Sequence, residues 1–137
     1  MNLKKSIMAL LFSVVLIAVA LVGCGGVEIP EPYEVNAIGQ GQQTFRFVVV
    51  DDEENATAWD VSTNENTVGA SLLEVGLIVG DVSAWGLLVT AVNGLTADFD
   101  ADGAWWAFYI NGEMAMQGVD ATYIQDGDTY AFVFTAG

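Results

Sequence analysis

The spacing of apolar positions along this 137-residue chain changes several times, and each change predicts a different element. Residues 45–50, Phe-Arg-Phe-Val-Val-Val, combine aromatic and β-branched side chains at a period of two, which is typical of a strand. Residues 58–63 alternate in the same way and are expected to pair with that strand. The charged and polar run at 51–55 between them is too polar to be buried and predicts a loop.

A helix is predicted over about Val68–Leu77. Thr67 can accept a hydrogen bond from the first turn as its N-cap, and Val68, Leu72 and Val75 fall on one face at helical spacing. Gly69 and Gly76 weaken the prediction, since each costs about 1 kcal/mol relative to alanine.

The rest of the chain predicts strands separated by turns. One strand is expected at 85–92, a hairpin at 105–116 around Asn111-Gly112, and a last strand in which Tyr130, Phe132 and Phe134 alternate. An Asn-Gly pair favours a two-residue type I′ turn, because both positions need positive φ. The order of elements predicts an α+β domain over residues 44–137, with one helix packed on a mostly antiparallel sheet.

The first 24 residues follow another pattern. Lys4 and Lys5 precede an apolar run at 7–22, whose 16 residues would span about 24 Å as a helix, short of a bilayer core of about 30 Å. Residues 21–24, Leu-Val-Gly-Cys, resemble the lipobox of bacterial lipoproteins. That resemblance implies that residues 1–23 are a removable signal peptide and that Cys24 carries diacylglycerol. The alternative is an uncleaved anchor with an incidental cysteine.

Lipidation would place the chain at the cell membrane, on its extracytoplasmic face. Residues 24–43 are then predicted to be the lipidated cysteine and a flexible tether, since Gly25-Gly26, Pro30, Pro32 and the Gly/Gln stretch at 39–43 interrupt any apolar periodicity.

The amino-acid composition excludes several classes of function. The chain has 18 acidic residues against three basic ones, and Arg46 is the single basic residue after Cys24. This negative charge repels phosphate backbones, so no nucleic-acid partner is expected. The same charge favours solubility and the binding of cations. Histidine is absent and Cys24 is the one cysteine, which excludes Ser-His-Asp and Cys-His catalysis and a His/Cys metal site. We therefore expect no enzymatic activity.

Residues 45–135 resemble the transcobalamin C-terminal-like domain of exported bacterial proteins. The resemblance is carried by Thr67-Val68 with Leu72-Leu73, Gly86, residues 92–95 (Val-Asn-Gly-Leu), residues 106–113 (Trp-Ala-Phe-Tyr-Ile-Asn-Gly-Glu) and residues 126–128 (Asp-Gly-Asp). It implies a β-grasp-like fold and makes cobalamin, or another corrinoid, the candidate ligand.

Both faces of the predicted hairpin are largely apolar. A two-residue turn pairs Tyr109 with Met114, and the family alignment assigns Trp106, Phe108 and Ile110 to the core. The opposite face is the candidate ligand surface, because exposed aromatic and thioether groups suit flat or adaptable ligands. It comprises Trp105, Tyr109, Met114 and Met116. The alternative is that a loop or the tether covers this face and makes it a second small core.

A second candidate site is acidic. Asp98, Asp100 and Asp102, followed by Gly103, match the first half of an EF-hand calcium loop. The twelfth position is Tyr109 rather than a bidentate glutamate, so weak calcium binding and a solvated loop both remain open.

These patterns favour a non-enzymatic, lipid-anchored extracytoplasmic binding module, with a corrinoid as the candidate ligand. One alternative is a surface protein–protein interaction module that uses the same aromatic face and has no small-molecule ligand. Another is a structural domain stabilised by calcium.

Overall fold

The structure is a computed structural model that describes residues 26–32 and 34–137. The predicted signal peptide and Cys24 lie outside the described residues. The elements are β1 (Val35–Gly39), β2 (Gln43–Val50), β3 (Ala56–Thr63), α2 (Val68–Glu74), β4 (Ile78–Ser83), β5 (Gly86–Val92), β6 (Leu95–Thr96), α3 (Phe99–Asp102), β7 (Ala104–Ile110), β8 (Glu113–Met114), the 3₁₀ turn η1 (Val119–Ala121) and β9 (Thr129–Ala136). The predicted α+β class is confirmed.

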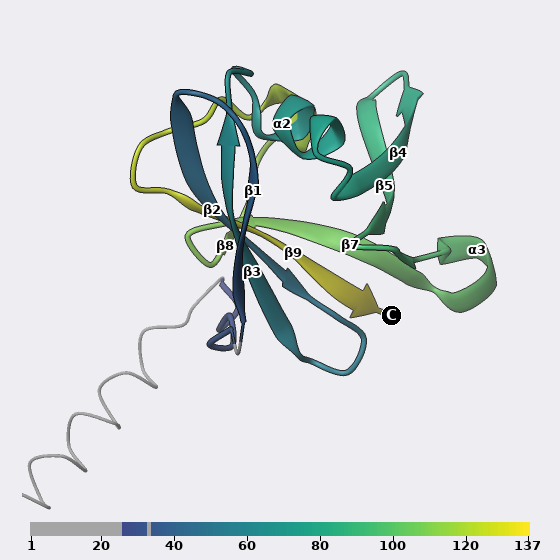
Figure 1. Cartoon of the computed structure of the whole chain (residues 1–137). Coiled ribbons are helices and arrows are strands. Elements are labelled where there is room, and N and C mark those ends of the chain that lie inside the picture. Colours follow the sequence, from purple (N-terminus) through teal and green to yellow (C-terminus); the bar gives the residue numbers. More distant parts are fainter. Residues whose placement is uncertain (1–25, 33) are drawn as a thin grey trace, which may run out of the picture.

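The strands form two sheets rather than the single sheet that the sequence predicts (Figure 1). Six strands form the large sheet in the order β1-β3-β2-β9-β7-β8, and β4-β5-β6 form a separate small one. The expected pairing of β2 with β3 is confirmed as antiparallel, whereas β1 with β3 and β2 with β9 are parallel. Two parallel strands need a long connection between them. The connection from β2 to β9 includes every element from β3 to η1.

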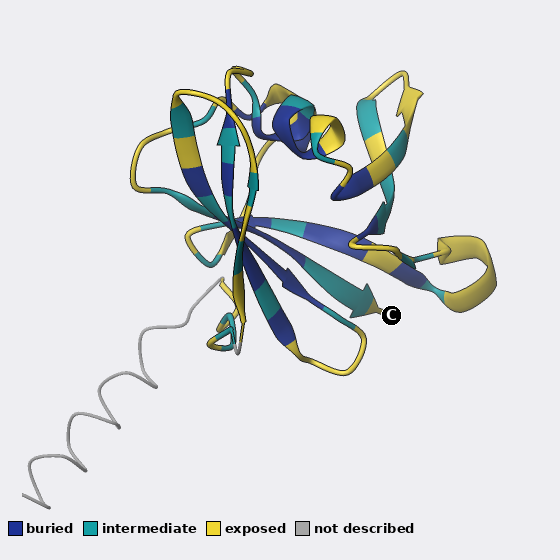
Figure 2. Ribbon diagram, in the orientation of Figure 1, coloured by how far each residue is buried: buried dark blue, intermediate teal, exposed yellow. Residues whose placement is uncertain are grey.

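The main core lies between the large sheet and the layer formed by α2 and the small sheet (Figure 2). Phe47 at its centre is fully buried, with its ring 6.2 Å from that of Trp59 and 6.1 Å from that of Phe132. The indole Nε1 of Trp106 on β7 donates to the backbone oxygen of Leu95 on β6 at 3.0 Å. This bond ties the two sheets together across the core.

Helix α2 confirms its predicted cap and its buried face. The Thr67 hydroxyl accepts from the backbone N–H of Ala70 at 3.2 Å, and Val68 and Leu72 are fully buried. The helix ends at Glu74, earlier than predicted, and Gly76 has a φ of +77°. Its left-handed backbone fits the glycine better than any other residue.

The opposite face of the large sheet holds a second, smaller core. It is built largely from small side chains, among them Ala58, Ala107 and Ala131, and Tyr109 is buried with them. Ile29 packs against this cluster, and the Val27 N–H donates to the Gly112 oxygen at 2.9 Å. Contrary to the predicted tether, this segment therefore covers a sheet face, and residues 35–39 form strand β1.

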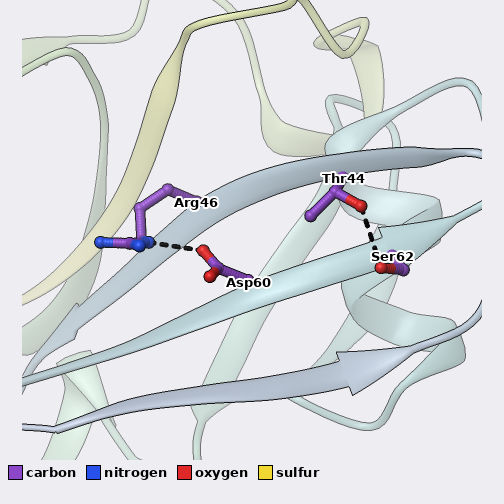
Figure 3. A network of polar contacts seen from close by, with 4 residues as sticks. All are labelled: Thr44, Arg46, Asp60 and Ser62. Carbon is purple, nitrogen blue, oxygen red and sulfur yellow. Dashed lines mark hydrogen bonds and ion pairs between the residues drawn. The ribbon is translucent and has the colours of Figure 1, made fainter.

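The part of that face next to the second core is polar (Figure 3). Arg46 Nε donates to Asp60 Oδ1 at 2.7 Å, and the Thr44 and Ser62 hydroxyls lie 3.0 Å apart. This hydrogen bond raises the pKa of Arg46. Both partners of the ion pair are well exposed, so it contributes at most about 1 kcal/mol.

Gly39 allows β1 to lie close to β3 and to Val75. Replacement of Gly39 by alanine tests how close this packing is. Gly39 has a φ of +82°, and an added Cβ would collide with the Ser62 backbone oxygen and meet Val75 Cγ1 at 3.0 Å. Gly76→Ala is the matched control, because its φ is +77° with nothing within 4 Å of the added carbon.

Both substitutions carry the left-handed strain of about 1–2 kcal/mol. We expect urea denaturation to show that Gly39→Ala lowers the free energy of unfolding by about 2 kcal/mol more than Gly76→Ala, the size of an overpacking penalty. Equal effects would show that β1 does not approach β3 so closely.

Candidate functional site

The β7–β8 hairpin has the predicted register, with Ile110 opposite Glu113 and Tyr109 opposite Met114. Asn111 and Gly112 have φ values of +53° and +81°, as a type I′ turn requires. Strand β8 ends at Met114, and one further backbone bond joins the Ala115 N–H to the Phe108 oxygen at 3.0 Å, so the paired part of the hairpin is shorter than the predicted 105–116.

The Asn111 side chain binds this turn to the turn that precedes β9. Its amide donates to Asp128 Oδ1, and its oxygen accepts from the Thr129 N–H, both at 2.9 Å. The Asn111 backbone N–H also donates to the Thr129 oxygen at 2.8 Å. The Asn-Gly and Gly-Asp motifs, which are distant in sequence, therefore form one hydrogen-bonded unit.

An open pocket of about 530 Å³ lies beside this unit, between the β8 end of the hairpin and the segment at 121–125. Met114, Met116 and Tyr123 supply apolar surface, and Asn111, Gln117 and Gln125 supply amide groups. Within residues 26–32 and 34–137, Glu113 is the single carboxylate in its lining. The backbone N–H of Gln125 donates to the phenol oxygen of Tyr130 at 2.9 Å. Burial raises the pKa of Tyr130.

The four residues predicted to form a ligand surface do not lie together on one. Met114 and Met116 line the pocket, and Met116 is 97% exposed. Tyr109 is only 7% exposed, because it belongs to the second core that Ile29 covers. Trp105 lies near the other end of β7, with its ring 6.0 Å from that of Phe99 on α3. The expectation of an exposed Tyr109 is therefore wrong.

The acidic triplet has a structural role at its first residue. The Asp98 carboxylate accepts from the N–H groups of Asp100 and Ala101, at 3.0 and 3.2 Å, and so caps α3. Gly103 ends this short helix at a φ of +64°. Across residues 26–32 and 34–137, no group of three or more acidic, cysteine or histidine side chains is placed to hold a metal ion. The predicted gathering of Asp98, Asp100 and Asp102 is thus not observed.

Sequence reasoning missed most of the pocket lining. Tyr123, Gln117 and Gln125 come from a stretch without apolar periodicity. Contacts of the 3₁₀ turn η1 with α2 hold this stretch in place, together with the hydrogen bond from the Ile124 N–H to the Asn66 oxygen and the bond between Gln125 and Tyr130. The sequence signal that could have indicated Tyr123 as a site residue is a large aromatic side chain close to a turn.

The pocket lining determines what can bind there. Thioether and phenol surface favours a flat apolar body, and side-chain amides favour neutral polar groups such as carboxamides. None of the described residues that line the pocket is basic, and Glu113 repels anions. The arrangement therefore suits a neutral or cationic ligand of moderate size, held without covalent chemistry.

No helix among the described residues combines the length and the apolar character needed to cross a bilayer. No curated protein matches the chain.

Two solved structures resemble this fold. The first, from Ruminococcus gnavus and described as a candidate metal-binding protein, is 25% identical with a TM-score of 0.66, and the match covers 70% of this chain and 99% of that one. The second is haptocorrin in complex with Cbi, at 17% identity and a TM-score of 0.55, with 68% of this chain and 25% of that chain covered. The chain thus spans about a quarter of haptocorrin, and this second likeness shows the fold alone.

A family model covers the domain from β3 to β9. It is described as a domain of unknown function, DUF4430, and it matches residues 57–136, more than half of the chain. The matched range includes the Asn111 hairpin, the Asp128 turn and the pocket between them. The chain belongs to the DUF4430 family.

Proposed function

We propose that this protein is a lipid-anchored extracytoplasmic module that binds a corrinoid in the pocket beside β8. The pocket, with Met114 and Met116 at its edge and the amides of Asn111 and Gln125 beside them, is the observation that carries the proposal. A corrin ring is flat and bears carboxamide side chains, which match these two kinds of group. The fold shared with haptocorrin, whose structure is a complex with Cbi, supports the proposal.

Calorimetric titration of the mature chain with cobalamin, and separately with cobinamide, tests the ligand. We expect saturable heat at micromolar to high micromolar concentration. An absence of heat with both compounds at that concentration would remove the corrinoid proposal while leaving the fold and the family unaffected.

Met116→Glu should weaken binding of cobalamin about tenfold, or about 1.4 kcal/mol, because a carboxylate replaces thioether surface at the pocket edge. Leu88→Glu is the matched control, since Leu88 is also exposed and apolar but lies on β5, outside the pocket lining. Titration of both variants measures the difference. Equal loss in the two would show that added negative charge, rather than the pocket, governs the affinity.

The anchor is tested separately. Mass spectrometry of the native protein should find a chain that begins at Cys24 with a diacylglycerol mass on its sulfur. A chain that retains residues 1–23 would contradict both the lipid anchor and the proposed location, but it would leave the pocket proposal standing.

A metal ion is the second candidate ligand, and the likeness to the Ruminococcus gnavus protein favours it. Calcium with a Kd of 1 mM would stabilise the fold by about 1.4 kcal/mol at 10 mM. On this second proposal, the melting temperature in 10 mM calcium should be several degrees higher than in chelator. Coincident melts would remove calcium as a candidate ligand.

A further inference from the structure

The β4–β5 hairpin exposes more large apolar surface than its packing against the described residues explains. Trp85 is 97% exposed and Val82 91%, and Val79 and Leu88 are also well exposed. Only the base of the hairpin, at Ile78 and Val92, is fully buried (Figure 2). Figure 1 shows the two strands projecting from the rest of the molecule beyond α2.

The exposed side chains lie on both faces of the hairpin and at its tip. Val82 is opposite Leu87 in the register, on the face that continues into the main core, while Leu88 is opposite Asp81 on the outer face. Directly opposed residues in an antiparallel pair share a face. The hairpin is therefore a projection with apolar groups on two sides, the shape that enters a groove rather than one that lies under a flat surface.

The tip is ordered before any partner arrives. The Ser83 hydroxyl donates to the Gly86 oxygen at 2.7 Å and accepts from the Trp85 N–H at 3.1 Å. Gly86 adopts a φ of +107°, which other residues rarely reach. Because the turn is fixed in this way, Trp85 loses less conformational entropy on binding than it would on a free loop.

The charges around the hairpin indicate the chemistry of its partner. The exposed carboxylate of Asp81 belongs to β4, and Asp120 on η1 is close enough that a Cβ at Gly86 would meet its oxygens at 3.1 Å. Helix α2, which packs against β4, ends at the exposed Glu74. Arg46, the one basic residue in the described part of the chain, is bonded to Asp60 on the far face of the large sheet. A second copy of this chain would bring like charges together, whereas a basic rim would be attracted.

The hairpin also faces away from the N-terminal segment. Ile29 packs on the second core, while Leu87 and Val89 of the hairpin pack on the main core, so the two lie on opposite faces of the large sheet (Figure 1). A chain tethered through residues before 26 can therefore present the hairpin away from its tether. Carboxylates beside the hairpin are also repelled by anionic lipid.

We propose that the β4–β5 hairpin is a docking element that inserts Trp85 and its apolar neighbours into a groove of another protein, whose rim carries lysine or arginine side chains. This inference does not rest on the pocket beside β8. Buried tryptophans that fill a partner's pocket are typical binding hot spots.

Site-specific photo-crosslinking in the organism that makes this protein tests the inference. Benzoylphenylalanine placed at Trp85 in the full chain should crosslink to one protein, and the same probe at Tyr123 should not. Tyr123 is the matched control, because it is an exposed aromatic on the pocket side of the fold.

The crosslinked protein is then purified and its affinity for the chain is measured. Trp85→Ala should weaken binding at least tenfold, as expected at a hot spot. Asp81→Lys should slow association and reduce its dependence on salt, because it replaces a negative charge on the hairpin, which attracts the basic rim of the partner, with a positive one. Circular dichroism should show both variants folded.

Several results would overturn the inference. They are a crosslink to a second copy of this chain, equal crosslinking from positions 85 and 123, no crosslink from position 85, and unchanged affinity in Trp85→Ala. Binding to phosphatidylcholine–phosphatidylglycerol vesicles that Trp85→Ala abolishes would assign the hairpin to the membrane instead.

Discussion

Phe47→Ala is expected to lower the free energy of unfolding by about 3–5 kcal/mol, the largest single effect that we predict. Phe47 is fully buried and lies against Trp59 and Phe132, so truncation leaves a cavity among rings that cannot readily collapse. A domain of this size has about 5–15 kcal/mol in total, so the variant would be close to unfolding. Denaturation in urea, followed by tryptophan fluorescence, measures the change.

Phe99→Ala is the matched control for that measurement. Phe99 is well exposed and contacts Trp105 at 6.0 Å between ring centroids. Surface substitutions of this kind change stability by about 0.5 kcal/mol or less. Similar losses in the two variants would show that the main core is not centred on Phe47.

Removal of residues 26–42 should lower the melting temperature by roughly 10 °C. Ile29 and Ile38 are each partly buried, and half of the about 1.5–3 kcal/mol for a fully buried isoleucine gives about 2 kcal/mol for the pair. At about 4–8 °C per kcal/mol for a domain of this length, that loss is easily measured by calorimetry. Loss of the five pairs between β1 and β3 adds to it.

The comparison chain begins at Gly26 and keeps both contacts. Replacing residues 26–32 with glycine and serine in that chain separates the contribution of Ile29 from that of β1. Coincident melts for the shortened and the longer chain would show that residues 26–42 are a flexible tether that does not stabilise the fold. Tyr109 would then be exposed to solvent.

Local patterns predicted much of the fold correctly. The alternation in β2, β3 and β9, the Thr67 cap and the register around Asn111-Gly112 all depend on interactions within a few residues or across one tight turn. Steric preferences and local hydrogen bonds decide such features, so the sequence is sufficient for them.

The candidate site was predictable only in part. Met114 and Met116 follow from the hairpin register, but the stretch with Tyr123 and Gln125 carries no period and is positioned by α2 and by Tyr130. Asp98 illustrates the opposite error, since its spacing resembles that of a calcium loop while its carboxylate caps a helix turn.

The sequence by itself therefore determined the α+β class, most of the strands, the helix face and the acidic surface. The tertiary structure decided that the strands divide into two sheets and that β1 and β9 add in parallel to β3 and β2. It also decided that Ile29 packs on the second core, to which Tyr109 belongs. The physical reason is that periodicity shows which faces of an element are apolar, but not which distant segment covers them. Several covers can bury similar area, and only long-range packing selects one.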